Sequence, residues 1–500
     1  MAEQIILNDS RKDVDEWYVG FKPNGGSIKP VHVAGGVLRS IYGEYNATMN
    51  IKRLALVSSN KGVVPKGNEL DAIYAWMMEN EMMEESVDKN SLDSLRNVMQ
   101  RLLSADKGVF VVAGLKDNMI SYTAGSSYFI TRGAMYEDTG EFMGGLIREY
   151  CPKLADYIKD LLASAKDPIS LLFEPVLEAK MEVFQDTSPH EKLPAFQNKD
   201  SNQHTKWFLD GIKESGLCLL ENLKAHPNAL TQLRLFNFFC IFHLVRYMAM
   251  LETFYCNQPI RPILLDFSKK PPHQSSVARA SELSYTQMYK SLNRFYAWGF
   301  AEWLKAKGYD KTALLECDVP VYEKRNNTSK ASKEELKTLW SLAKNHIQDM
   351  VSEEEVLLTF GETIYDMLAL QATSHPVKFL RALGTLSGIL YPPDTFHPDK
   401  RFMLSQDMLE MLLRSCVRTG EILSGREIRE RLWKRFGIIV GGSQFELGKI
   451  SESGMIMQVD EDALETNFAS FAATLKAMDF AEEMADGILQ IRLGGLNNGR

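Results

Sequence analysis

The sequence lacks paired cysteines. The chain of 500 residues has six cysteines, and no two of them form a CxxC pair. Several lie within apolar runs, such as FNFFCIFHLV around Cys240. This pattern favours buried free thiols in a reducing compartment over a disulfide framework. We therefore expect a cytoplasmic protein.

A long uninterrupted apolar run is also missing. A membrane-spanning helix needs about 20 nearly uninterrupted apolar residues. The longest apolar tract, residues 233–251, is interrupted by Arg234, Asn237, His243 and Arg246. The first residues, MAEQIILNDSRKDVDEW, turn polar too early for a signal peptide. We expect no membrane contact, and we interpret residues 233–251 as the buried helix of a soluble core.

Positive charge is not in excess. The chain has 57 Lys and Arg against 65 Asp and Glu, a net charge of -8 at pH 7. This balance excludes sequence-independent coating of nucleic acid by the whole surface, although a local basic patch stays compatible with it. The hydrophobic fraction of 45% is ordinary for a folded chain. A chain of this length exceeds what one core usually supports, so it should be multidomain.

Catalytic and metal-binding signatures are missing as well. The sequence contains no HExxH, HxH or GxSxG motif, and its nine histidines are scattered. Asp138 and Glu141, in YEDTGEF, are expected in a turn and not on the strand that a metal-dependent nuclease would need. We expect no metal, no cofactor and no catalytic centre, while an enzyme with an unfamiliar site remains an alternative.

The order of apolar patterns predicts a mainly α, multidomain chain. Short β-branched runs (KPVHVAGGVLRSIYG, IKRLALVSS, GVFVVAG and SYTAGSSYFITRGAMY) alternate with two helical patterns (ELDAIYAWMMENEMMEES and NSLDSLRNVMQRLLSADK) near the start. Helical patterns dominate afterwards, and the polar stretch YEKRNNTSKASKEE is the best candidate linker. The predicted domains are a small mixed α/β N-terminal domain (1–145), a helical domain (146–325), a helical connector (326–399) and a C-terminal winged-helix-like domain (400–500).

The stretch SGREIRERLWKRFGIIVGGS, residues 424–443, carries the clearest functional signal. It has the glycines of a phosphate loop but no following lysine, and its helix precedes the strand, so a Walker motif is excluded. Ser424 and Glu427 instead form a capping box for a helix that buries Ile428, Leu432 and Phe436. GIIVGG and GMIMQVD are the expected strands of a wing.

The outward face of this predicted helix is basic. Between residues 400 and 436 there are nine Lys or Arg against five Asp or Glu. Arginine-rich helix faces suit phosphates and guanine edges. Contact with DNA, docking of a protein and a plain solvated face held by Arg–Glu pairs all remain open. The candidate nucleic-acid-binding residues on this face are Arg426, Arg429, Arg431, Lys434 and Arg435.

A second helix-turn-helix candidate spans residues 276–308, with its turn at 282–284. The second helix would present Lys290 and Arg294 to nucleic acid, just after the basic KKPPHQ segment. The favoured alternative is that the aromatic residues of this stretch belong to the core. The acidic stretch 460–487 is expected to face solvent.

The segments LGTLSGILYPPDTFHPDKRFMLSQDMLEMLLRS and RERLWKRFGIIVGGS together resemble accessory proteins of bacterial anti-phage defence islands. The resemblance covers roughly the last 120 residues and rests on the rhythm of apolar positions. It implies a non-catalytic subunit that binds DNA or docks a partner such as an ATPase or a nuclease. The alternatives are a viral-type RNA-binding nucleoprotein or structural interaction protein and, third, a metal-dependent nuclease.

Overall fold

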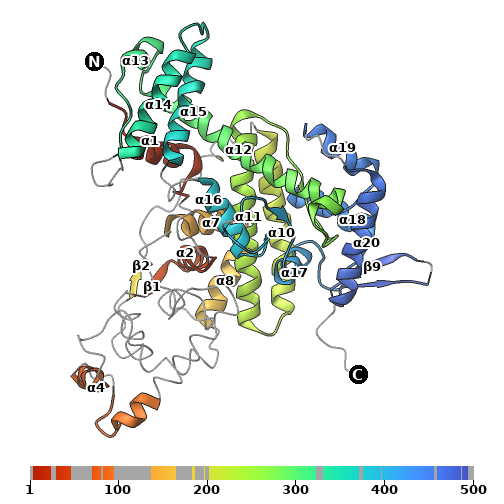
Figure 1. The fold of residues 1–500 in the computed structure, drawn as a ribbon. Helices are drawn as coiled ribbons and strands as arrows, with labels where there is room; N and C mark the ends of the chain where they lie inside the picture. Colours follow the sequence, from red (N-terminus) through yellow and green to blue (C-terminus); the bar gives the residue numbers. More distant parts are fainter. Residues whose placement is uncertain are drawn as a thin grey trace.

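The protein is mainly helical, which confirms the predicted fold class (Figure 1). The computed structural model describes residues 4–23, 30–46, 70–79, 83–94, 137–164, 183–185, 196, 202–322, 330–370, 376–395, 397–454, 459–485 and 487–493. Residues 323–329 of the predicted linker lie outside these residues, whereas residues 330–335 of it begin a helix. Three of the four predicted N-terminal strand segments, residues 51–59, 108–114 and 121–136, also lie outside the described residues.

Helix α11 (Ala229–Cys256) forms the centre of the molecule. Asn228 caps its N-terminus by accepting a hydrogen bond from the Thr231 amide at 3.0 Å, and Asn257 ends it in the left-handed conformation with φ 51°. The helix is long and apolar enough to cross a membrane by length and composition, but 94% of its apolar window is buried inside the protein. The prediction of a buried core helix is therefore confirmed.

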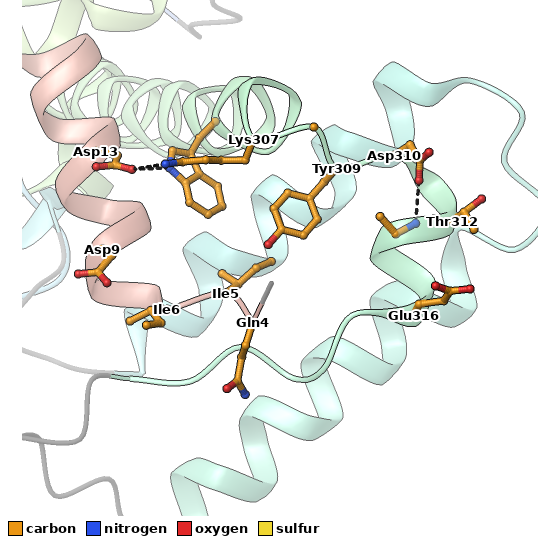
Figure 2. Close-up of a pocket in the computed structure, with 13 residues that line it drawn as sticks. Gln4, Ile5, Ile6, Asp9, Asp13, Lys307, Tyr309, Asp310, Thr312 and Glu316 are labelled. Carbon is orange, nitrogen blue, oxygen red and sulfur yellow. Dashed lines mark hydrogen bonds and ion pairs between the residues drawn. The ribbon is translucent and has the colours of Figure 1, made fainter. Parts of the chain in front are cut away.

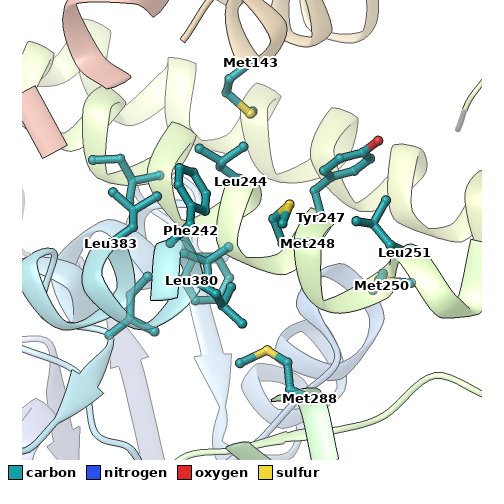
Figure 3. Packing of buried hydrophobic residues seen from close by; sticks show 14 of the residues in the cluster. Met143, Phe242, Leu244, Tyr247, Met248, Met250, Leu251, Met288, Leu380 and Leu383 are labelled. Atoms are coloured by element: carbon teal, nitrogen blue, oxygen red, sulfur yellow. The ribbon is translucent and has the colours of Figure 1, made fainter. Parts of the chain in front are cut away.

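Other helices surround α11 on several sides. Figure 3 shows Phe242, Leu244, Tyr247, Met248 and Leu251 of α11 packed among apolar side chains of its neighbours. Those neighbours are α7 (Glu137–Tyr150), α12 (Ser276–Ala306) and α16 (Pro376–Leu386), which supply Met143, Met288, Leu380 and Leu383. Each fully buried side chain of this size stabilises the fold by about 1.5–3 kcal/mol.

The remaining helices form groups on either side of this centre (Figure 1). At one end lie α1 (Leu7–Val14), a π-helical turn (Asp15–Val19), α13 (Lys311–Glu316), α14 (Lys330–His346) and α15 (Glu353–Ala369). Next to α11 lie α2 (Pro30–Tyr42), α8 (Pro152–Ser164), α10 (Gln203–Ala225) and α17 (Gln406–Arg414). On the other side lie α18 (Gly425–Phe436), α19 (Gln444–Glu452) and α20 (Glu461–Ala477), while α4 (Leu70–Glu79) lies apart.

The strands that the structure describes are short and form four small sheets. β1 (Glu44–Asn46) pairs antiparallel with β2 (Val183–Gln185), β3 (Ile263–Leu264) pairs parallel with β7 (Ile438–Ile439), and β4 (Leu390–Tyr391) pairs antiparallel with β5 (Arg401–Phe402). The fourth sheet has the order β6 (Ile422–Ser424), β9 (Leu489–Arg492), β8 (Ala481–Glu483), with antiparallel pairs throughout.

Two N-terminal predictions are wrong. KPVHVAGGVLRSIYG was expected as a strand signal but forms helix α2, whose Val33, Val37 and Leu38 are buried at helical spacing against α7. Asp138 and Glu141 were expected in a turn but lie on α7. The Asp138 carboxylate accepts a hydrogen bond from the Lys22 amide, and Glu141 pairs with the buried Arg39. In both cases the packing of α2 against α7 determined the structure, and not the local sequence signal for a strand or a turn.

One hydrophobic cluster includes buried residues from all four predicted domain ranges, from Ile5 to Leu493. The parallel β3–β7 pair and the isolated bridge between Ile6 and Val321 also join segments far apart in the chain. This shared core does not separate the chain at residues 145, 325 or 399. The predicted domain boundaries therefore stay predictions.

Helices α12 and α15 approach each other closely at Gly361. A Cβ added to Gly361 of α15 would lie 2.2 Å from the Ala297 carbonyl oxygen and 2.9 Å from the Ala301 amide nitrogen of α12. Gly361→Ala should therefore push the two helices apart and lower the free energy of unfolding by about 1–3 kcal/mol. The urea midpoint measures this loss.

The matched control is Gly448→Ala in α19, where an added Cβ meets nothing within 4 Å. Alanine is the better helix former, so this variant should be neutral or slightly more stable. Equal midpoints for the two variants would contradict the close packing of α12 on α15.

Candidate nucleic-acid interface

Helix α18 begins and ends as its sequence predicts. The Ser424 hydroxyl accepts a hydrogen bond from the Glu427 amide, and the Glu427 carboxylate accepts one in return from the Ser424 amide at 2.7 Å. Gly437 ends the helix with φ 70°. The predicted inward residues, Ile428, Leu432 and Phe436, are all buried.

Two of the predicted DNA-contacting arginines are bound to neighbouring segments of the fold. Arg435 is only 7% exposed, and its Nη1 donates to the carbonyl oxygen of Ser415 at 2.7 Å. Arg431 forms a two-bond pair with the Glu421 carboxylate at 2.6 and 2.7 Å and also donates to the Cys416 carbonyl. Hydrogen bonds from Arg431 hold the pKa of Glu421 down at about 2.

The other three cations of α18 also face carboxylates of the same chain. Lys434 pairs with Glu214 of α10 at 2.8 Å, and Arg426 pairs with Glu430 at 2.7 Å. Arg429 is largely covered, lying 3.7 Å from Glu446 and over the Phe468 ring. Only the side chains of Arg426 and Lys434 are mostly exposed, at 82% and 67%. The basic face is therefore largely neutralised.

The wing predicted after α18 is not formed by the expected segments. GIIVGG contains β7, which pairs in parallel with β3 and not with a hairpin partner. The expected connecting loop, SQFELGKISES, contains helix α19, and residues 455–458 of GMIMQVD lie outside the described residues. β7 is apolar on both faces, so burial against β3 satisfies it better than an exposed wing would.

The second helix-turn-helix prediction is wrong. Residues 276–306 form one continuous helix, α12, with no turn at 282–284. Its aromatic residues Phe295, Phe300 and Trp303 are buried, as the core alternative expected. Lys290 is exposed on this helix. Arg294 binds the Glu252 carboxylate through two hydrogen bonds of 2.6 and 3.0 Å.

A different basic site lies where the loop before α12 meets the β4–β5 turn. We call it the basic cleft. It has a volume of about 400 Å³. Its lining residues are Lys269, Pro271, Pro272, Glu282, Tyr391, Pro392, His397, Asp399, Lys400 and Arg401.

Two buried cations hold the walls of the basic cleft together. The Lys400 ammonium donates to the carbonyl oxygens of Pro392 and Asp394, both at 2.5 Å, which fixes the turn after β4. The Arg401 Nη1 donates to the Lys270 carbonyl at 2.5 Å and lies 3.3 Å from the Asp266 carboxylate. Arg401 therefore joins the β4–β5 turn to the loop before α12.

The electrostatic balance of the basic cleft is positive. Burial and the nearby Arg381 lower the pKa of Lys400 to about 8, against the opposite effect of Asp394, so the ammonium stays charged at neutral pH. Burial and Asp399 raise the pKa of Glu282. Three Lys or Arg line the cleft against two Asp or Glu: Lys269, Lys400 and Arg401 against Glu282 and Asp399. Lys270, Arg279 and Arg381 adjoin it, as do Asp266 and Asp394.

An aromatic ring completes this site. Tyr391 is 41% exposed, and the Arg401 guanidinium lies 5.2 Å from its ring centroid. Tyr391 and Arg401 were not among the residues predicted to bind nucleic acid, and Lys269 was noted only as part of the basic KKPPHQ segment. The sequence contains one indication of this site: KKPPHQ and YPPDTFHPDKR both combine prolines with basic residues. A single sequence does not show, however, that two loops about 120 residues apart lie together.

A second, larger cavity has the opposite character. It measures about 680 Å³ and is lined by Asp9, Asp13, Asp310 and Glu316, with Lys307 beside them. In Figure 2, dashed lines join Asp13 to the Trp303 indole and Asp310 to the amide at the start of α13. Acidic walls repel phosphate, so the basic cleft is the better candidate for nucleic acid.

The described residues offer little else for chemistry. They contain no group of three or more His, Cys, Asp or Glu side chains able to hold a metal ion. All six cysteines are free, and five are buried, as predicted. Burial raises the pKa of the Cys151 and Cys416 thiols to about 12, which makes them poor nucleophiles.

No family model and no curated protein matches this chain. The resemblance of the C-terminal segments to accessory proteins of defence islands stays a prediction.

The neutralised face of α18 predicts a stability effect. Arg435→Met should lower the free energy of unfolding by about 1–3 kcal/mol, because the buried Ser415 carbonyl would lose its side-chain donor while the Cys416 carbonyl keeps Arg431. Arg426→Met, on the exposed side of the same helix, should leave it almost unchanged, because an exposed ion pair contributes little to stability. Chemical denaturation of both variants distinguishes a buried structural cation from an exposed one. Equal losses of unfolding free energy in the two variants would contradict this assignment.

Proposed function

We propose that this protein is a non-catalytic nucleic-acid-binding protein whose basic cleft holds an unpaired nucleotide segment. The observation that carries the proposal is that Lys269, Lys400 and Arg401 line one cleft of an otherwise acidic chain, with Lys270 and Arg279 exposed beside it. Local positive charge provides the phosphate contacts that dominate affinity for nucleic acid. The net charge of -8 limits such contact to this part of the surface.

The shape of the basic cleft favours a single strand over a duplex. A volume of about 400 Å³ accepts a nucleotide but not a double helix. Lys269, Lys270 and Arg279 are exposed around it and available for phosphates. Tyr391 offers a ring face for a base, and such stacking contributes about 1–3 kcal/mol per base without regard to sequence.

This proposal changes the residues expected to bind nucleic acid. The five cations of α18 already face internal carboxylates, so they would have to break those pairs to reach a phosphate. A nucleic-acid-binding subunit of a bacterial defence complex and a viral-type RNA-binding nucleoprotein both remain compatible with the basic cleft. The free, mostly buried cysteines support a reducing, cytoplasmic compartment.

Loss of two exposed lysines should weaken binding in a salt-dependent way. We expect Lys269→Gln with Lys270→Gln to lower affinity for a labelled single strand of about 16 nucleotides. Each lost phosphate contact should reduce the slope of log K against log salt by about 0.7. Fluorescence anisotropy at several salt concentrations measures both changes, with RNA and DNA strands compared in parallel.

The matched control is Arg426→Gln with Lys434→Gln, which removes the two most exposed cations of α18. Its affinity and salt slope should equal those of the unmodified protein. Loss of binding in this control but not in the lysine variant would move the interface back to α18. Absence of salt-dependent binding in the unmodified protein would refute the proposed function.

A second candidate function, protein docking, is favoured by the order of the C-terminal elements. Helix α17, strand β6, helices α18 and α20, and the β8–β9 hairpin follow one another as in a winged helix, with β7 and α19 inserted before α20. In that arrangement α20 would be the recognition helix. It exposes Asp460, Asp462 and Glu465, and the hairpin tip exposes Met484 and Ile488. The acidic groups repel DNA, and the exposed apolar groups suit a protein partner.

Charge reversal tests this second candidate. If only the repulsion between its carboxylates and phosphates prevents α20 from binding DNA, replacing two of them with lysine should allow binding. We therefore expect Asp462→Lys with Glu465→Lys to give the protein salt-dependent affinity for duplex DNA. The matched control, Glu353→Lys with Glu354→Lys at the start of α15, makes the same charge change elsewhere. Equal duplex binding by both variants, or by neither, would contradict a recognition-helix position for α20.

A further inference from the structure

Arg246 of α11 is a buried cation whose guanidinium nitrogens have no hydrogen-bond acceptor. The residue is 1% exposed, and Nε, Nη1 and Nη2 are all unpaired among the described residues. Its guanidinium lies 4.6 Å from the Trp207 ring centroid and 4.7 Å from that of Phe208. Ring faces attract a cation but accept no conventional hydrogen bond, so five N–H groups stay unsatisfied.

The surroundings do not supply the missing negative charge. Burial lowers the pKa of Arg246 to about 9, with no carboxylate acting against it. Arg261, which lines the same cavity, is already paired with Glu252, and Glu252 also binds Arg294. His243, one turn earlier on α11, is fully buried, and burial together with Arg246 keeps its pKa well below the usual value. The region around Arg246 therefore carries an excess of positive charge, which is unfavourable in a buried place unless a partner compensates it.

A small cavity lies against Arg246. Its volume is about 20 Å³, slightly more than the about 10–15 Å³ that one water-sized group requires. Trp207, Met250, Ile260, Arg261 and Phe436 are among its lining residues. This volume is too small for a phosphate or a metabolite carboxylate, but it suits one monatomic ion.

The local backbone keeps this space open. A Cβ added to Gly211 of α10 would lie 2.3 Å from the Arg435 carbonyl oxygen and 3.3 Å from Arg246 Nη1. Glycine at this position lets α10, α11 and the end of α18 meet around the guanidinium. The cavity is thus located where three helices join.

We propose that this cavity is a halide site, in which a chloride ion accepts the hydrogen bonds of Arg246. The site is separate from the basic cleft and does not depend on nucleic-acid binding. The bound ion neutralises Arg246 at the junction of α10, α11 and α18. Chloride therefore stabilises the attachment of α18 to the central helices.

Melting temperatures in two salts test the site. We expect the unmodified protein to melt at least about 2 °C higher in sodium chloride than in sodium gluconate at equal ionic strength. Arg246→Met should abolish this difference. Arg426→Met, which removes an exposed arginine paired only with Glu430, should retain it. An equal difference in all three proteins, or none in the unmodified protein, would overturn the proposal.

A second measurement does not require any variant to fold. Crystals of the unmodified protein in sodium bromide should show an anomalous peak within contact distance of the Arg246 guanidinium. Absence of that peak means that no halide enters the cavity and overturns the proposal. A peak without any chloride effect on melting means binding at crystal concentration only, and overturns it as well.

Discussion

The burial of α11 is the constraint on which the rest of the structure depends. A helix of 28 residues that is apolar on nearly every side must be covered on every side. α10, α12, α16 and α17 pack against it, together with the N-terminal helices α2 and α7. Segments from residue 5 to residue 493 therefore share one core. Both the basic cleft and the cavity beside Arg246 lie next to this core.

Charge compensation explains why the most basic stretch of the sequence is not the most basic surface. The arginines of α18 lie beside Glu421, Glu430 and Glu446, and beside Glu214 of α10. Each pair joins α18 to a neighbouring segment or to itself. In the basic cleft the balance is different, because Lys269, Lys270 and Arg279 remain exposed. A cation that fixes the fold is a poor phosphate ligand, since its own carboxylate competes for it.

The sequence was most informative where the signals are local. The capping box at Ser424, the buried faces of α11 and α18, and the free cysteines all follow from nearby residues and are confirmed. Predictions failed where a segment distant in the sequence determines the local structure. Residues 30–42 form a helix because α7 packs against them, and β7 pairs with β3 instead of forming part of a wing. The basic cleft was missed for the same reason, because Arg401 and Lys270 meet only through tertiary contact.

We propose that unpaired nucleic acid binds in the basic cleft. Ultraviolet crosslinking of a single strand to the full chain, followed by mass spectrometry of the linked peptides, tests it most directly. We expect crosslinks at Tyr391 and in the peptide that contains Lys269 and Lys270. Crosslinks confined to residues 425–436 would contradict this account and return the interface to the arginine face of α18.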